Sequence, residues 1–377
     1  MLKILDYIHD HPGTWEKDLL EEPYCIATVW DGDYCLLKYS HLASDFSIPM
    51  VRECRGLILY KDTERVFSPV CVPFFKFSNY GESYAADLDW RSARVMEKVD
   101  GSLIKVWFHM GKWHVSTNNT IDAKTAILWN NKSFYDLFLE AVRKVTIDDT
   151  FFKTLDTNYT YMFELVSPDS QVVIHYPSTE IYYLTCRNNE SLEEDWAKGA
   201  AEMAGVGVRI PKIYPLTSLE ECIAATTAMT KDEEGFVACD AHGNRVKIKS
   251  QEYINAHIAR NNNIITTKRI LQMIRAGTLD DFLAYAPDFE PQVEKVLDAY
   301  ISLQIHLDTK WQIISSIPDI KNMSKAKFYS RIKDYSPVTR DFLCQKFDKK
   351  CDSALKYLDN LRFSILLKII KERLGEI

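Results

Sequence analysis

The sequence contains no Cys-x-x-Cys pair, although nine cysteines are spread along its 377 residues. An odd number of scattered cysteines argues against a disulfide framework, and the missing pairs argue against a zinc cluster. No apolar run approaches the roughly 20 residues that cross a bilayer. The acidic Asp6 comes too early for a secretory signal. These absences predict a reducing, cytoplasmic setting and no membrane partner.

A net positive charge is also missing, since the formal net charge is −7. The charge is unevenly spread. Residues 319–377 contain 14 lysines and arginines against 8 aspartates and glutamates, a net +6, which leaves −13 for the remainder. A basic segment on an acidic protein is typical of a surface that binds a phosphate backbone. It is equally typical of a solvated helix face of mixed charge.

Internal repeats and low-complexity tracts are absent, and short β-rich runs fill much of the first 250 residues. Turn residues such as Asp31-Gly32-Asp33 separate runs rich in β-branched and aromatic residues, which is typical of hairpins. We expect strands at 27–30, 34–39, 56–60, 66–67, 103–108, 113–116, 159–166, 172–176, 181–186, 235–239 and 245–249. We expect helices over 122–145, 193–204 and 218–229.

The pattern changes after the polar break at Asn261-Asn262-Asn263. Beyond it, apolar residues recur with helical spacing, and little alternates with period two. The spaced positions are Val293, Val296, Tyr300, Leu303 and Leu307, and later Leu358, Leu361, Ile365 and Ile369. The sequence therefore predicts an α+β protein. Residues 1–260 form a domain of mixed antiparallel sheets and helices, and residues 261–377 form an all-helical C-terminal domain.

Five short motifs in the first domain carry residues suited to nucleotide chemistry. In chain order they are Glu53-Cys54-Arg55-Gly56, Phe75-Lys76-Phe77, Lys98-Val99-Asp100-Gly101-Ser102, Phe163-Glu164-Leu165, and Glu234-Gly235 followed by Lys247-Ile248-Lys249. Taken alone, each has an ordinary explanation, because an arginine before a strand often forms a surface ion pair and a lysine between aromatics often reaches out to solvent. Glu164 is harder to explain in this way, since a carboxylate inside an apolar strand needs a partner.

Taken together, the motifs describe a phosphoryl-transfer site centred on Lys98. A lysine attacks phosphorus only as a free amine, and its reference pKa is about 10.4. Neighbouring cations and a bound metal lower that pKa. Lys247 and Lys249 share one face of a strand, because side chains alternate along it. We expect this pair to lower the pKa of Lys98 and to hold a triphosphate.

Four more residues complete the predicted site. Arg55 and Lys76 are cations able to stabilise charge on phosphoryl oxygens. Glu164 and Glu234 supply the hard oxygen ligands that Mg²⁺ (or Mn²⁺) prefers, or a hydrogen bond to a ribose hydroxyl.

The order of these motifs, from Val51 to His257, resembles the covalent nucleotidyltransferase superfamily of ATP-dependent ligases and mRNA capping enzymes. Within it, the chain resembles the bacteriophage RNA ligases that repair tRNA. The resemblance implies a nucleotidyltransferase (ATP-grasp-like ligase) domain in which Lys98 becomes linked to AMP. It also implies that Arg55 and Lys76 bind the phosphates of ATP.

The later motifs carry further roles by the same resemblance. Glu164 is expected to reach the nucleotide or the metal, Glu234 to bind the metal, and Val237 to lie against adenine. The strand at 181–187 is expected to stack on adenine, but the sequence leaves open whether Tyr183, Leu184 or neither does so.

The chain after Tyr253 lacks the even run of short strands of the β-barrel that follows in DNA ligases and capping enzymes. This absence favours the RNA-ligase branch, where the resemblance implies an all-helical domain that helps to dock tRNA. The implied substrates are ATP and RNA with 5′-phosphate and 3′-hydroxyl ends, including nicked tRNA, with Mg²⁺ (or Mn²⁺) as cofactor. The implied setting is the host cytoplasm if a phage encodes the chain, and no obligate protein partner is evident. A GTP-specific capping-type enzyme and a non-catalytic RNA-binding protein remain as alternatives.

Overall fold

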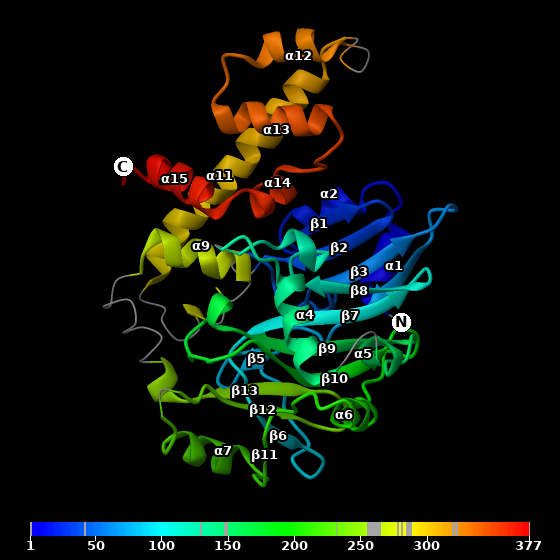
Figure 1. The fold of residues 1–377 in the computed structure, drawn as a ribbon, viewed down its shortest axis with the longest axis vertical. Helices are drawn as coiled ribbons and strands as arrows, with labels where there is room; N and C mark the ends of the chain where they lie inside the picture. Colours follow the sequence, from blue (N-terminus) through cyan, green and yellow to red (C-terminus); the bar gives the residue numbers. More distant parts are fainter. Residues whose placement is uncertain are drawn as a thin grey trace. The chain divides into compact units, whose positions relative to one another are not determined.

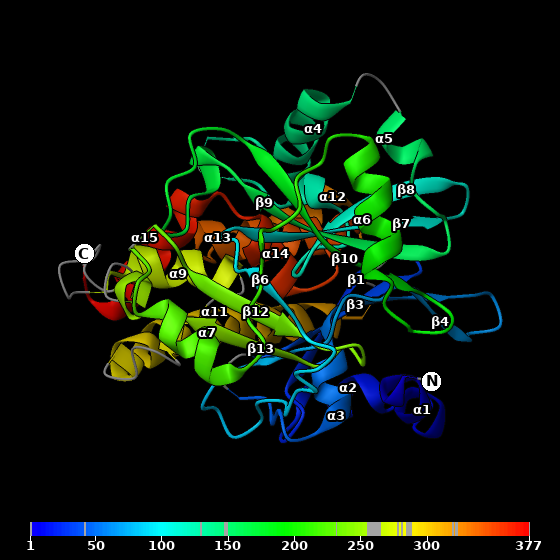
Figure 2. The ribbon, with the colours of Figure 1, turned by 90° about the horizontal axis from the view of Figure 1, so that it is seen from below.

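The computed structural model describes residues 2–40, 43–128, 130–146, 150–230, 232–254, 265–276, 279, 282–283, 289–318, 320 and 323–376. Figures 1 and 2 trace the chain from two directions. It divides into two compact units, residues 1–265 with 276–287 and residues 266–275 with 288–377. The predicted boundary between residues 260 and 261 and the polar break at 261–263 lie outside the described residues. Within the described ranges, no helix is long and apolar enough to cross a membrane.

The first unit begins with an antiparallel sheet in the order β1-β2-β3-β4, made of β1 (Ile26–Asp31), β2 (Tyr34–Tyr39), β3 (Arg55–Lys61) and β4 (Phe67–Cys71). The helices that contribute to its apolar cluster are α1 (Lys3–Asp10), α2 (Trp15–Leu20) and α3 (Pro49–Glu53). The buried carboxylate of Glu53 accepts hydrogen bonds from the backbone N–H groups of Lys3 at 3.1 Å and Ile4 at 3.0 Å. It thereby satisfies free donors in the first turn of α1, where a negative charge is favourable.

The second sheet has the order β10-β9-β7-β8 and contains β7 (Ser102–His109), β8 (Lys112–Thr117), β9 (Tyr159–Val166) and β10 (Glu180–Asn188). The helices that follow its strands are α4 (Phe134–Val145), α5 (Thr150–Lys153) and α6 (Trp196–Gly205). Phe138 of α4 and Met203 of α6 join Phe163 and Tyr183 of the strands in one buried cluster. A smaller cluster contains Leu103 and Met162 of the strands together with Phe74, Phe77 and Leu184.

The third sheet has the order β11-β6-β12-β13-β5 and contains β5 (Ser78–Asn79), β6 (Arg94–Glu97), β11 (Ile213–Tyr214), β12 (Gly235–Cys239) and β13 (Arg245–Lys249). All its pairs are antiparallel except β13 with β5. Helix α7 (Leu219–Thr226) packs on it through Cys222, which clusters with Phe236 and Ile248. Because β6 leads directly into β7, the Lys98–Gly101 segment connects the third sheet to the second.

The described elements of the second unit are helices, namely α9 (Thr267–Ala276), α11 (Glu290–Ser315), α12 (Lys325–Ile332), α13 (Pro337–Phe347), α14 (Ala354–Asn360) and α15 (Phe363–Leu374). The five predicted positions from Val293 to Leu307 are all buried on α11, which confirms that helical pattern. The later pattern is confirmed at Leu358, which is buried on α14, but it is out of phase by one residue on α15. Leu366 and Ile370 are buried on α15, whereas Ile365 is 40% exposed. The reason is the break between α14 and α15, which shifts the phase of the helix.

The expected hairpins are confirmed, with β12 and β13 at the predicted residues. Two other predictions are wrong. The helix expected over 122–145 begins only at Phe134, because Ser133 and Asp136 form a reciprocal capping box there. The run 172–176 forms no strand, since the backbone N–H groups of Val173 and Ile174 bind the Asp100 carboxylate instead of a neighbouring strand.

Candidate active site

A cavity of about 140 Å³ lies between the second and third sheets of the first unit. Its walls come from the β6–β7 connection, from strands β9, β10, β12 and β13, from the start of β3, and from the segment between β4 and β5. The predicted site residues that line it are Arg55, Lys98, Glu164, Glu234, Val237, Lys247 and Lys249. Residues from five separate parts of the sequence thus meet in one place.

Lys98 directly follows β6, and both its backbone N–H and its side-chain amine have partners. Its backbone N–H donates to the carbonyl of Gly235 at 2.9 Å, and its Nζ lies 2.8 Å from Oε1 of Glu234. The same oxygen lies 3.1 Å from Nζ of Lys249. The Lys98 side chain is 17% exposed and that of Glu234 is 3% exposed. The Lys98 amine therefore faces the cavity beside a carboxylate and a second cation rather than bulk solvent.

The Asp100-Gly101 pair fixes the path of the chain between the two sheets. The Asp100 carboxylate accepts hydrogen bonds from the backbone of Val173 at 2.8 Å and Ile174 at 2.7 Å, and from Tyr253 Oη at 2.9 Å. Burial and the nearby Glu234 raise the pKa of Asp100, while the two N–H donors oppose that rise. A Cβ on Gly101 would lie 2.4 Å from the Leu165 carbonyl oxygen, so only glycine allows this approach to β9.

Glu164 and Arg55 line the cavity from β9 and β3. Burial raises the pKa of Glu164 to about 7, with Glu234 adding to the rise and the positive charges of Lys98 and Arg55 opposing it. The Arg55 guanidinium lies 4.7 Å from the ring centroid of Phe74 and 5.8 Å from that of Phe77. Its buried Nη1 has no hydrogen-bond partner among the described residues. This nitrogen is a donor suited to an anion in the cavity.

Strand β13 presents three cations to the cavity, one more than predicted. Arg245, Lys247 and Lys249 alternate with Val246 and Ile248, which pack in the apolar cluster under α7. Sequence reasoning missed Arg245, although the alternation Arg-Val-Lys-Ile-Lys carried the signal. Because side chains alternate along a strand, the residue two before Lys247 lies on the same face.

Lys76 is placed differently from the prediction, and the structure separates Tyr183 from Leu184, between which the sequence left the choice open. Lys76 is not among the cavity-lining residues, and its Nζ lies 5.1 Å from the ring centroid of Phe46. Its phosphate-binding role stays a prediction. Tyr183 is fully buried in the cluster beneath α6, whereas Leu184 lines the cavity. The register of β10 against β9 shifts between Tyr183 and Thr185, so a bulge turns Leu184 toward the cavity.

The carboxylates of the site fit a divalent cation of the Mg²⁺ type. Glu164 and Glu234 both line the cavity, and Glu234 Oε2 is buried without a hydrogen-bond partner among the described residues. No group of three or more His, Cys, Asp or Glu side chains is close enough to form an all-protein metal site in the described part of the chain. Mg²⁺ needs none, because it commonly keeps several waters and takes one or two carboxylates together with substrate phosphates.

Comparison with known proteins agrees with this geometry. The RNA ligase family model matches residues 53–253, more than half of the chain. A protein of Autographa californica nuclear polyhedrosis virus, named provisionally as a bifunctional polynucleotide kinase/RNA ligase, is 32% identical over 73% of this chain. The matched region is 40% of that relative's length. The RNA ligase of Rhodothermus phage RM378 is 26% identical, over 75% of this chain and 76% of its own.

Among solved structures, an archaeal ATP-dependent RNA ligase superposes with a TM-score of 0.48 and 13% identity, covering 78% of this chain and 82% of its own. The family assignment comes from the sequence match, which spans every motif from Glu53 to Tyr253. The chain therefore belongs to the RNA ligase family.

Proposed function

We propose that this chain is an ATP-dependent RNA ligase that joins a 5′-phosphate to a 3′-hydroxyl end through lysyl-AMP and adenylated-RNA intermediates. The observation that carries the proposal is the position of the Lys98 amine, 2.8 Å from Glu234 in a cavity that also contains Lys247, Lys249 and Arg55. A half-buried amine with cations and a carboxylate around it is suited to attack on an anionic phosphate.

In the first step, the neutral amine of Lys98 attacks the α-phosphorus of ATP. A phosphorus–nitrogen bond forms, the bond from the α-phosphorus to the bridging oxygen breaks, and pyrophosphate leaves with the electron pair. One proton of the amine passes to solvent. Glu234 holds the amine in place before the attack, and Lys247 and Lys249 offset the charge of the phosphoryl oxygens.

The next two steps return the lysine to its starting state. The AMP passes from Lys98 to the 5′-phosphate of RNA, and the 3′-hydroxyl then attacks that phosphate and expels AMP. Storing AMP on a nitrogen divides one difficult condensation into easier transfers.

Glu164 and Glu234 are the residues we assign to the metal. Bound Mg²⁺ or Mn²⁺ would neutralise phosphate charge and favour the free amine. Glu234 already shares Oε1 with two ammonium groups, so its unpartnered Oε2 is the donor left for a cation. Glu164 must be ionised to serve as a ligand, and its pKa of about 7 makes that state available at neutral pH.

We further propose that the all-helical C-terminal domain docks RNA, including nicked tRNA, in a repair reaction. The names of the viral and phage relatives support RNA as the substrate class. The net +6 of residues 319–377 supports a phosphate-backbone contact by this domain. Ligation of nicked anticodon loops compared with linear single strands would test the tRNA preference.

The test of the central proposal is incubation with α-labelled ATP and Mg²⁺, followed by intact mass. We expect the parent protein to gain one AMP and the Lys98→Ala variant to gain none. Lys112→Ala removes an exposed lysine at the start of β8 and should label like the parent. A labelled Lys98→Ala variant would refute the role of Lys98. An adduct with GTP alone would indicate a capping-type enzyme, and no adduct with either nucleotide would favour a non-catalytic RNA-binding protein.

A further inference from the structure

Arg245 lies at the start of β13, on the same face as the predicted lysine pair, and its position is unusually well fixed. Its Nη1 donates to Glu194 Oε1 at 2.9 Å and to the Gly243 carbonyl at 3.1 Å, and its Nη2 pairs with Glu194 Oε2. The guanidinium also lies 5.1 Å from the ring centroid of Phe74. The side chain is 8% exposed and lines the cavity.

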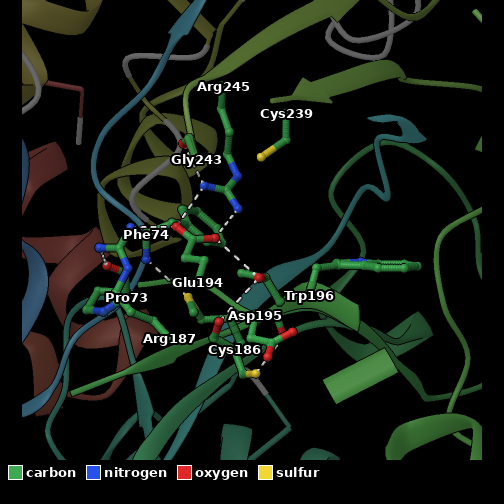
Figure 3. A network of polar contacts seen from close by, with 12 residues as sticks. Pro73, Phe74, Cys186, Arg187, Glu194, Asp195, Trp196, Cys239, Gly243 and Arg245 are labelled. Atoms are coloured by element: carbon green, nitrogen blue, oxygen red, sulfur yellow. Dashed lines mark hydrogen bonds and ion pairs between the residues drawn. The ribbon is translucent and has the colours of Figure 1, made fainter. Parts of the chain in front are cut away.

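A second arginine holds the same carboxylate from the other side. Arg187 Nη2 lies 2.5 Å from Glu194 Oε1, and its Nη1 donates to the Pro73 carbonyl at 2.9 Å. Figure 3 shows Glu194 between the two guanidinium groups. Although burial opposes ionisation of Glu194, the charges and hydrogen bonds of Arg245 and then Arg187 lower its pKa to about 2. Two guanidinium groups and one carboxylate leave an excess of one positive charge beside the cavity.

The cations of the cavity extend along the whole of β13, with Lys247 between its two ends. Lys98 and Lys249 meet at Glu234, at one end of β13. Arg245 lies at the other end of that strand, four residues away, which corresponds to roughly 13 Å of extended backbone. Arg245 and Arg55 both lie against Phe74, at 5.1 and 4.7 Å from its ring centroid. We refer to Arg55 and Arg245 as the Phe74 arginine pair.

Phosphoryl transfer requires the attacking and leaving groups to lie roughly in line with the transferred phosphorus. If the Lys98 amine attacks the α-phosphorus, the β- and γ-phosphates must lie on the side away from that amine. Of the Phe74 arginine pair, Arg55 lowers the pKa of Glu164 together with Lys98, whereas Arg245 lies at the end of β13 away from Lys249. A guanidinium fork matches phosphate oxygens well, and Arg245 has five N–H donors, of which the hydrogen bonds above use three.

We propose that Arg245 is a further phosphate-binding residue, which holds the β- and γ-phosphates of ATP and then the leaving pyrophosphate, and that Glu194 and Arg187 are its positioning residues. This inference rests on the proposed ligase function and deepens it. Glu194 fixes the fork and prevents the two buried guanidinium groups from repelling each other. Because Glu194 neutralises only one of the two guanidinium charges, the group of Arg245, Glu194 and Arg187 keeps one net positive charge.

The partial reactions of a ligase separate this role from a structural one. Lysyl-AMP formation and its reversal by inorganic pyrophosphate both involve the phosphates that Arg245 would hold. Sealing of pre-adenylated RNA involves no pyrophosphate. For Arg245→Ala we expect the ATP concentration for half-maximal lysyl-AMP formation to rise about 10- to 100-fold, the effect of losing charge-assisted hydrogen bonds. Reversal by pyrophosphate should weaken similarly, while sealing of pre-adenylated RNA stays within about twofold.

Two further variants sharpen the test. Glu194→Gln keeps the shape of the side chain but removes its charge, so it should weaken the pyrophosphate-dependent reactions while sealing is largely retained. Arg94→Ala is the matched control, because Arg94 pairs in register with Cys239 as Arg245 does but does not line the cavity. We expect Arg94→Ala to leave ATP dependence unchanged.

The outcomes distinguish this inference from the proposed function. A parent protein that forms no lysyl-AMP and seals nothing would refute the ligase function itself. A parent that works normally, with an Arg245→Ala variant of unchanged ATP and pyrophosphate dependence, would overturn only the inference. Equal losses in sealing and in lysyl-AMP formation for both Arg245→Ala and Glu194→Gln would show that the network serves folding alone, and would overturn it as well.

Discussion

At the scale of single residues, the site is defined by ionisable side chains whose neighbours determine their charge. Glu164 is the clearest case. It is a half-buried carboxyl group with Glu234 nearby, and the positive charges of Lys98 and Arg55 only partly offset the cost of burying its charge. The protein thus keeps a carboxyl group close to half-ionised at neutral pH, at a place where a bound cation would favour the ionised form.

This environment predicts how stability depends on pH. The pKa of Glu164 in the folded state is about 7, above its ordinary value of 4.5. Its contribution to stability is therefore fully present below pH 4.5 and is lost as the pH rises through 7. The loss in unfolding free energy is on the order of 3 kcal/mol. Glu164→Gln removes this pH-dependent loss. Without nucleotide, the melting temperature of the variant minus that of the parent should therefore increase from pH 5 to pH 8. A constant difference would contradict the raised pKa.

Much of the candidate site could be predicted from single residues, and there are physical reasons why the rest of it could not. Lys98, Glu164, Glu234 and the β13 lysines occur in motifs whose residue types and order are informative by themselves. Arg245 lies outside those motifs, and its importance depends on Glu194, 51 residues away in the sequence. The choice between Tyr183 and Leu184 depends on a bulge, which a one-residue shift in register creates and which the strand's composition does not reveal.

At the scale of elements, local signals predict hairpins better than they predict where a helix begins or what a loop does. The β12–β13 hairpin follows from alternation and turn residues alone, which are local properties. The segment 172–176 has equally β-rich residues, but two of its N–H groups bind Asp100, more than 70 residues earlier in the chain. Such a long-range hydrogen bond overrides local preference, and no pattern within the segment indicates it.

Helix α6 illustrates how an element is fitted to its sheet. Tyr183 of β10 is fully buried, and its hydroxyl donates to the carbonyls of Asp195 at 3.4 Å and Trp196 at 3.3 Å. The ring extends beneath the helix to Gly199, where an added Cβ would lie 2.1 Å from Tyr183 Oη. The absence of a side chain at Gly199 is therefore what lets α6 approach the sheet closely.

We expect Gly199→Ala to lower the free energy of unfolding by about 1–3 kcal/mol, because overpacking forces rigid neighbours to move. Gly205→Ala, in the last turn of the same helix, is the control. Nothing lies within 4 Å of its added Cβ, so it should be neutral or up to about 1 kcal/mol more stable. Denaturant unfolding measures both variants. A Gly199→Ala variant as stable as Gly205→Ala would show that α6 can move away from Tyr183 at little cost.

At the scale of the whole molecule, charge and chemistry are divided along the sequence. The candidate site lies in the first unit, whereas the basic excess lies in residues 319–377, within the second. In the second unit, Lys327 and Arg331 of α12 are exposed and four residues apart, so they share one side of the helix. If this unit docks RNA, its contacts should affect RNA binding without affecting the reaction of Lys98 with ATP.

The double variant Lys327→Glu with Arg331→Glu tests this division. Each lost phosphate contact reduces the salt dependence of binding to single-stranded RNA by about 0.7 in log–log slope, so two lost contacts should reduce it by about 1.4. RNA affinity at low salt should fall at the same time, while lysyl-AMP formation stays at the parent level.

Lys112→Glu with Lys153→Glu makes the same charge change at exposed positions of the first unit and serves as the control. RNA titrations at several salt concentrations measure both variants. Equal losses would mean that only net charge matters, and no loss in the α12 variant would place the RNA contact elsewhere.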